Sequence, residues 1–234
     1  MNQIAAMRWL LAVISLSACS GEIATATDDG GPTDTAPTTD APADCKAALA
    51  FYGVQFTEGP DNPGIADPVT ATVPIAGISW RYSGNANPRP MLMGDCTLIR
   101  SLAEAAPILT ARDIVEVTDI GVYNYRCIGG GTPPNCPNGI SQHAYATAID
   151  IAGVTTSAGV FSSVNDDWVI DPNAEETCLA PAEPGKDQFL HELICALKTA
   201  KVWNIVLTPN YNADHRNHFH VDLTPDSDFI ELRH

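Results

Sequence analysis

The chain has 234 residues and a formal net charge of −16, which comes from 28 acidic and 12 basic side chains. Proteins that bind nucleic acid need Lys and Arg to neutralise phosphates, so this balance argues against nucleic acid as a partner. The charge carries no information about the fold, whereas the length is sufficient for one domain with a full hydrophobic core.

The first nineteen residues predict an export signal. Arg8 supplies a sparse positive region, and the apolar run from Trp9 to Leu16 is too short to span a bilayer. Small residues precede Cys19, as in bacterial lipoprotein signals in which this Cys is lipidated; an ordinary secretory signal is the alternative. Several acyl chains give stable anchoring. Because Ser20 rather than Asp follows the Cys, we expect a cell envelope lipoprotein, on the periplasmic side of the outer membrane in a Gram-negative cell.

Residues 20–44 consist mainly of Thr, Ala, Pro, Asp and Gly, so they predict a disordered acidic tether. Residues 45–234 then form one domain with six cysteines, and an even number in an exported domain implies disulfides. Many pairings are possible. Proximity in the sequence alone favours the pairs Cys45–Cys96, Cys127–Cys136 and Cys178–Cys195. A zinc site made of cysteines is the alternative, but the chain has no C-x-x-C pair.

The expected secondary structure of this domain combines helical spacing, strand alternation and loops rich in Gly and Pro. In chain order it comprises a short helix over Cys45–Tyr52, strand-like alternation over 70–82, a helix over Cys96–Ala106 that ends before Pro107, a strand and turn over 113–125, a long loop over 129–139, a strand over 149–151, a strand or hairpin over 154–170, an acidic loop over 171–185, a helix over Asp187–Thr199, and strands over 204–207 and 219–223. The mixture predicts an α+β fold, with an antiparallel sheet and helices packed on one side of it.

Two short segments about seventy residues apart bring together the residue types that bind metal. They are Ser141–Asp150 (SQHAYATAID) and His215–His220 (HRNHFH). A catalytic zinc takes three N or O ligands and leaves a fourth position open. On one continuous helix, His143 and Asp150 would lie roughly 10 Å apart along the axis, too far for one ion. We therefore expect a loop followed by a strand, with Asp150 on the face opposite Ile149 and Ile151.

The second segment predicts a strand with one polar face. A period of two places His218, His220 and Asp222 on one face, and the apolar residues between them on the other. A metal site is a reason for such a polar face. The alternative is a disulfide-stabilised envelope domain without metal, in which the histidines cluster incidentally. Arg126 either faces this site or is a solvated charge at the end of a strand.

These segments also resemble known families. Ser141–Asp150 resembles the S-x-H-x-x-G-x-A-x-D signature of D-alanyl-D-alanine carboxypeptidases and dipeptidases. With the His-x-x-His-x-His of the second segment, it is similar to a wider group that includes penicillin-insensitive murein endopeptidase and the Hedgehog signalling domain. The stretches SQHAYATAIDIAG and LTPNYNADHRNHFHVDL most closely resemble the bacterial extensin-like protein C-terminal family, and this resemblance runs from about Cys45 to Leu223.

The resemblance implies a Hedgehog/DD-peptidase-like fold with one Zn²⁺ per chain on the sheet. It implies His143, Asp150 and His220 as metal ligands, and His218, with His215 nearby, beside the attacking water or the transition state. Three features depart from the related patterns. Ala146 stands in place of the signature glycine, the Glu that serves as base in the carboxypeptidases is absent, and Arg126 precedes Cys127 where the order Cys-Arg is expected.

The expected function is therefore a zinc-dependent peptidase that hydrolyses peptide bonds in peptidoglycan stems or cross-links. In this hypothesis His218 is the base, and His215 or Arg126 stabilises the oxyanion. Ser141 and Asp222 orient the ligands from outside. A non-catalytic zinc-containing module that binds or supports the cell wall is the alternative, because fold does not determine function.

Overall fold

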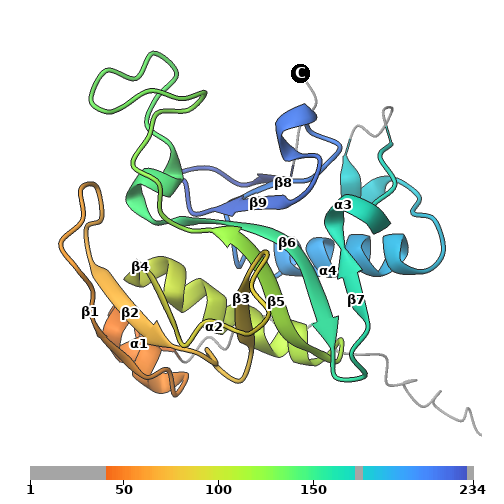
Figure 1. Cartoon of the computed structure of the whole chain (residues 1–234), viewed down its shortest axis with the longest axis horizontal. Coiled ribbons are helices and arrows are strands. Elements are labelled where there is room, and N and C mark those ends of the chain that lie inside the picture. The colour runs from red at the N-terminus through yellow and green to blue at the C-terminus, as the bar shows by residue number, and fades with distance from the viewer. Residues whose placement is uncertain (1–40, 172–175, 231–234) are drawn as a thin grey trace, which may run out of the picture. The chain divides into compact units, whose positions relative to one another are not determined.

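The computed structural model describes residues 41–171 and 176–230. The predicted signal peptide, Cys19 and most of the predicted tether lie outside these residues. The described part is an α+β domain (Figure 1), as the sequence predicts. None of its helices combines the length and the apolar character needed to cross a membrane.

In the described part of the chain, the larger of two sheets has seven strands, in the order β10-β8-β9-β6-β5-β3, with β7 paired to β6. The strands are β3 (Ser79–Tyr82), β5 (Ile114–Gly121), β6 (Ala148–Thr156), β7 (Phe161–Ser163), β8 (Ile205–Leu207), β9 (Phe219–Asp222) and β10 (Phe229–Ile230). Two of its pairings, β3 with β5 and β8 with β10, are parallel. The sequence predicted an antiparallel sheet, and the other pairings are antiparallel, but these two parallel pairs make the sheet mixed. A helix lies on the connection from β3 to β5, and such a crossover lets two strands run in the same direction.

A smaller antiparallel sheet has the order β1-β2-β4. It contains β1 (Phe56–Glu58), β2 (Pro68–Thr72) and β4 (Met91–Asp95). The sequence pattern predicted neither β1 nor β4, because β1 is short and β4 contains Gly94 in place of a β-branched side chain.

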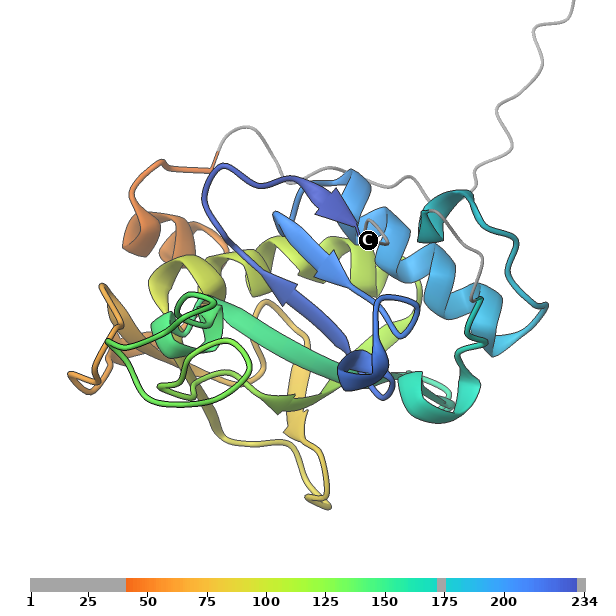
Figure 2. The ribbon, with the colours of Figure 1, turned by 90° about the horizontal axis from the view of Figure 1, so that it is seen from above.

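The helices are α1 (Cys45–Phe51), α2 (Cys96–Thr110), α3 (Val164–Asp167) and α4 (Lys186–Thr199), and the 3₁₀ turns are η1 (Gln142–Tyr145), η2 (Thr177–Leu179) and η3 (Ala213–His215). Figure 2 shows α2 and α4 together on one face of the larger sheet. Trp203 connects these layers, since its indole is buried and Nε1 donates a hydrogen bond to Ser101 Oγ of α2 at 3.2 Å. The opposite face of the sheet is thereby left available for a site.

Helix α2 does not end before Pro107, as predicted, but continues to Thr110. A proline inside a helix removes one backbone hydrogen bond and favours termination. Here Ile108 and Leu109 are buried in the core, and their burial outweighs the local preference. At its other end the helix is capped by Asp95, whose Oδ1 accepts a hydrogen bond from the N–H of Thr97 at 3.0 Å.

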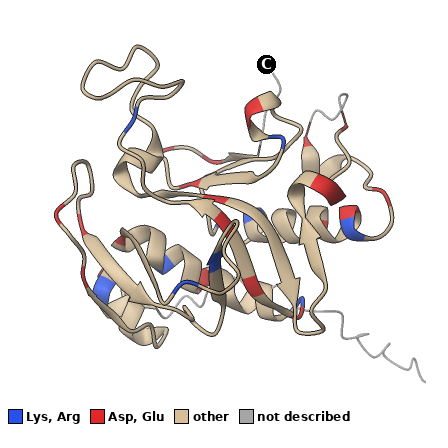
Figure 3. Ribbon diagram, viewed as in Figure 1, with Lys and Arg blue, Asp and Glu red and all other residues tan. Residues whose placement is uncertain are grey.

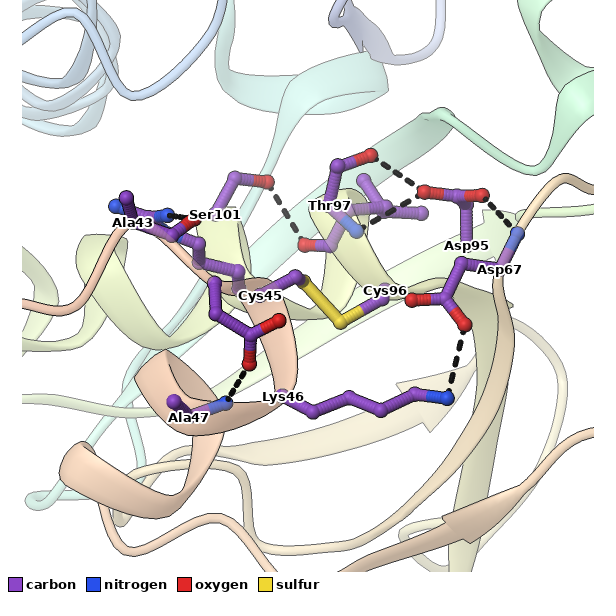
Figure 4. Close-up of a disulfide and its surroundings, with 12 residues drawn as sticks. Ala43, Cys45, Lys46, Ala47, Asp67, Asp95, Cys96, Thr97 and Ser101 are labelled. Carbon is purple, nitrogen blue, oxygen red and sulfur yellow. Dashed lines mark hydrogen bonds and ion pairs between the residues drawn. A yellow bond between two sulfur atoms is a disulfide. The ribbon is translucent and has the colours of Figure 1, made fainter.

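All three predicted disulfides are present, so the pairing by proximity is confirmed. Figure 4 shows Cys45–Cys96, which joins the first residues of α1 and α2 with a Cα–Cα distance of 6.1 Å. Beside it, Lys46 pairs with Asp67 at 3.0 Å. Acidic side chains are spread over both sheets and the helices, with fewer basic ones among them (Figure 3).

Candidate metal centre

His143, Asp150 and His220 meet at one point on the open face of the larger sheet. His143 Nε2 lies 3.2 Å from Asp150 Oδ1 and 3.2 Å from His220 Nδ1, and the last two atoms are 3.0 Å apart. Among the described residues, these three form the group of His, Cys, Asp and Glu side chains close enough to hold one metal ion. We call them the metal cluster.

The local structure around His143 explains how two residues seven positions apart converge. Ser141 caps η1, and its Oγ accepts a hydrogen bond from the N–H of His143 at 3.3 Å. The turn ends at Ala146, whose φ of 52° lies in the left-handed region. The chain then enters β6, which carries Asp150. A turn followed by a strand was the predicted arrangement, and the left-handed residue explains why the related signature has glycine there.

Strand pairing brings the third residue of the cluster into place. β6 and β9 are antiparallel neighbours in which Asp150 stands directly opposite His220. Phe219 and Val221, which flank His220, are buried in the core, so the alternation predicted for this strand is correct. The register thus places a carboxylate and an imidazole side by side on the open face.

Each imidazole of the cluster is oriented by a second contact. Nδ1 of His143 donates to the backbone carbonyl of Val122 at 2.7 Å, and Nε2 of His220 donates to Asp222 Oδ2 at 3.0 Å. Both partners are acceptors only, so the outer nitrogen of each ring carries the proton. In a neutral ring the inner nitrogen then presents a lone pair. Such outer contacts are typical of histidines that bind metal.

When both rings are neutral, three acceptor atoms therefore converge, and a cation between them would stabilise this arrangement. Tetrahedral zinc with ligands at about 2.0–2.2 Å places ligand atoms roughly 3.3–3.6 Å apart, close to the observed separations. The donor set of two imidazoles and one carboxylate is of the type found in catalytic zinc sites. The residues present thus fit the ion that the resemblance implies.

The pKa values of the metal-free cluster also show that its environment stabilises a positive charge. Burial would lower the pKa of His220, but its contacts with Asp150 and Asp222 raise that pKa to about 9. Burial would raise the pKa of Asp150, but the hydrogen bonds with His143 and His220 hold it well below its usual range. A proton on His220 therefore occupies the place that a metal ion would take.

His218 and His215 lie beside the cluster. His218 Nε2 is 3.5 Å from Asp150 Oδ1, while its Nδ1 donates to Asn217 Oδ1 at 2.8 Å. The ring of His215 has its centroid 5.3 Å from that of His218 and 5.8 Å from that of His220. Burial lowers the pKa of both, in His215 to about 4 with a contribution from the charges of His220 and His218. Both rings are therefore neutral near pH 7.

Two asparagines contribute to the site in ways that the sequence pattern did not indicate. Asn212 Oδ1 accepts hydrogen bonds from His215 Nδ1 at 2.7 Å and from the N–H of Asp214 at 2.9 Å. The second bond fixes the amide orientation, so Nδ1 of His215 must carry its proton. Asn217 Oδ1 accepts the corresponding hydrogen bond from His218 Nδ1 at 2.8 Å. Both asparagines lie close to histidines in the segment NYNADHRNHFH, and this proximity could have indicated their roles. The sequence contains no corresponding indication that the carbonyl of Val122 contacts His143.

The other predicted site residues occupy different positions. Asp222 contacts the outer nitrogen of His220 directly, and Ser141 acts through the backbone of His143. Arg126 accepts a hydrogen bond from the N–H of Ser141 through its carbonyl at 3.1 Å. Within residues 41–171 and 176–230, its guanidinium makes no hydrogen bond or ion pair with the cluster.

The cluster is open to solvent on one side. The side chain of Asp150 is 19 % exposed and those of His218 and His220 are 13 % exposed, whereas His143 is at 5 %. A ligand can therefore approach past Asp150 and His218, while His143 lies at the base.

Comparison with known proteins identifies the family. The model of the family described as extensin-like protein C-terminus matches residues 43–230. No curated protein and no solved structure matches the chain. The match covers both segments of the site and all three disulfides, so the chain belongs to the extensin-like protein C-terminus family.

Proposed function

We propose that this protein is a zinc-dependent peptidase of the cell envelope that hydrolyses peptide bonds in peptidoglycan stems or cross-links. The observation that carries the proposal is the convergence of three acceptor atoms at 3.0–3.2 Å, with both outer ring nitrogens bonded to acceptors. One Zn²⁺ per chain, a Hedgehog/DD-peptidase-like fold and a lipid anchor at Cys19 belong to the same proposal.

Bound zinc supplies a Lewis acid that lowers the pKa of a water ligand toward about 7 and polarises the scissile carbonyl. The protein must then accept and return a proton. His218 suits this role because its ring is neutral and Nδ1 is bonded to Asn217, so that Nε2, 3.5 Å from Asp150 Oδ1, is left to take up a proton. An imidazole in this position acts as base and then as acid toward the leaving amine.

His215 was a candidate for oxyanion stabilisation, which requires a donor. Its Nδ1 proton is committed to Asn212, so Nε2 is an acceptor in the neutral ring. We therefore assign His215 to proton transfer beside His218. Arg126 is the remaining candidate for the oxyanion among the residues singled out from the sequence.

The alternative, a non-catalytic zinc module that binds or supports the cell wall, follows from the absence of a glutamate base. The carboxylates of Asp150 and Asp222, which contact the cluster, are both bonded to His220. Neither is free to act as a base, so catalysis depends on the histidines. If they do not provide it, the zinc site is structural.

Metal analysis of the purified chain, followed by digestion of purified peptidoglycan, tests the proposal. We expect about one zinc per chain, loss of zinc in His143→Ala, and retention in the control His215→Ala, which removes an imidazole that is not a ligand. Mass spectrometry should detect new peptide termini with the wild type. Zinc without new termini favours the structural module, and chains that remain free of zinc after reconstitution contradict both.

A further inference from the structure

We propose that a hollow next to the metal cluster binds a carboxylate of the peptide substrate, and that Arg81 is the residue that recognises it. The hollow has a volume of about 420 Å³ and lies on the open face of the larger sheet. Its lining includes Arg81, Thr118, Ile120, Ala152, Phe161 and Asn217. We call it the Arg81 pocket. The inference deepens the proposed function and rests on it.

Two residues that line the Arg81 pocket, Ala152 and Asn217, lie close in the chain to residues of the site. Ala152 follows Asp150 by two residues on β6, so both side chains point to the same face, about 7 Å apart along the strand. At another point on its rim, Asn217 is the residue whose amide holds His218. The pocket therefore approaches the site from the side of Asp150 and His218.

Arg81 is held in a fixed position before any ligand arrives. Its Nε donates to Glu116 Oε1 at 2.8 Å, Nη2 donates to Thr118 Oγ1 at 2.7 Å, and Nη1 donates to the carbonyl of Asn85 at 3.1 Å. A guanidinium has five N–H donors, so two remain, one on each terminal nitrogen. Two such donors match the two oxygens of a carboxylate.

Preorganisation favours recognition at this position. The Arg81 side chain is only 21 % exposed, and the three contacts already restrict it, so little conformational entropy is lost on binding. Glu116 offsets the charge of the guanidinium, and the remaining lining carries no charge. Selectivity for a carboxylate thus comes from directed donors rather than from a general positive field.

The remaining lining suits a peptide. Thr118 and Asn217 offer a hydroxyl and an amide that can bond to backbone amides, while Ile120 and Phe161 provide apolar contact for small side chains. Phe161 is 37 % exposed, so part of its ring is available to a ligand. Such a mixture is typical of pockets in which a few polar groups set the orientation.

The strand register sets how far this carboxylate lies from the scissile bond. Arg81 pairs with Thr118, and Thr118 pairs with Gly153, three residues beyond Asp150 on β6. Three residues along the strand and two strands across give roughly 14 Å between the α-carbons of Asp150 and Arg81. An extended peptide spans about 3.3–3.6 Å per residue. We therefore infer a carboxylate two to four residues from the bond that is cleaved.

A synthetic stem pentapeptide and its cross-linked dimer, with each carboxylate converted in turn into a carboxamide, test this inference. For the wild type we expect one conversion to raise KM at least ten-fold with little change in kcat. Arg81→Gln should have similar KM values for the acid and for that amide, because the two guanidinium donors are lost. If Arg81→Gln discriminates as well as the wild type, the inference is wrong.

The matched control is Arg100→Gln, which also removes one Arg–Glu pair, with Glu104 at 2.8 Å, but lies on α2 away from the pocket. It should discriminate as the wild type does. A second variant, Ser83→Asp, adds a negative charge to the pocket lining at an exposed position and leaves the Arg81 contacts in place. Ser83→Asp should raise KM for the acid more than for the amide. This variant tests the inference independently if Arg81→Gln does not fold.

Binding separates a failure of this inference from a failure of the proposed function. If the wild type hydrolyses none of the peptides, the same acid and amide forms are titrated into the zinc-loaded protein and followed by NMR. Carboxylate-dependent binding that Arg81→Gln abolishes supports the pocket although the peptidase proposal fails. Equal binding of the acid and amide forms to the wild type overturns the pocket.

Discussion

His220 lies in β9, and His218 directly precedes this strand. The two imidazoles differ in what surrounds their ring nitrogens. His220 contacts Asp150 and Asp222 on opposite sides of the ring, whereas His218 contacts Asn217 and approaches Asp150 only at 3.5 Å. We therefore expect His220→Ala to lose both zinc and turnover. His218→Ala should keep zinc and lose about 10²–10⁴-fold in kcat. Metal content and initial rates measured on the same samples check this, and a fully active His218→Ala enzyme would remove the proposed base.

The proton on metal-free His220 predicts how zinc binding depends on pH. Because the pKa of His220 is raised to about 9, this ring is protonated at pH 7, and zinc must displace the proton. Apparent zinc affinity should rise about ten-fold per pH unit from pH 7 toward 9 and then level off. Asp150 stays ionised throughout, because its pKa is held low.

Calorimetry in buffers of different ionisation enthalpy measures the protons released. We expect about one per zinc at pH 7, and fewer in Asp222→Asn, which lacks one of the carboxylates that raise the pKa of His220. Release of no proton by the wild type would contradict this account of the cluster.

At the scale of elements, the junction of η1 and β6 depends on Ala146. A left-handed conformation costs an L-residue roughly 1–2 kcal/mol, and glycine avoids this, but Ala146 is fully buried and its methyl contributes about 1 kcal/mol. The free energy of unfolding of Ala146→Gly should therefore lie within about 1 kcal/mol of the wild type. The control Ala148→Gly, at an equally buried position in β6, should be clearly less stable. Urea denaturation compares them, and equal losses would show that the turn is not strained.

Local sequence patterns predicted some features of the helices and strands and missed others. The alternation in β9 and the position of Asp150 opposite Ile149 and Ile151 follow from the two-residue period of a strand, so they could be predicted. The end of α2 could not, because the proline rule is local, whereas the burial of Ile108 and Leu109 depends on the rest of the core.

At the scale of the whole molecule, the disulfides close loops of different length. Cys45 and Cys96 are 51 residues apart, and Cys127 and Cys136 are 9 apart. Chain entropy predicts losses of about 4 and about 2.5 kcal/mol when the respective pairs are replaced by alanine. Thermal unfolding of the two double variants measures the difference. A larger loss from the shorter loop would show that local packing, rather than chain entropy, decides.

The sequence by itself determined the positions of α1, α2 and α4, the polar faces of β6 and β9 and the family resemblance, because each depends on residues close in the chain or on a contiguous motif. The disulfide pairs followed from the order of the cysteines along the chain. Only the tertiary structure decided that Asp150 stands opposite His220, that the carbonyl of Val122 and the amide of Asn212 fix the ring protons, and that Arg81 lines a pocket beside the cluster. These relations join residues far apart in the chain. They depend on the register and packing of the folded sheet, which no local periodicity encodes.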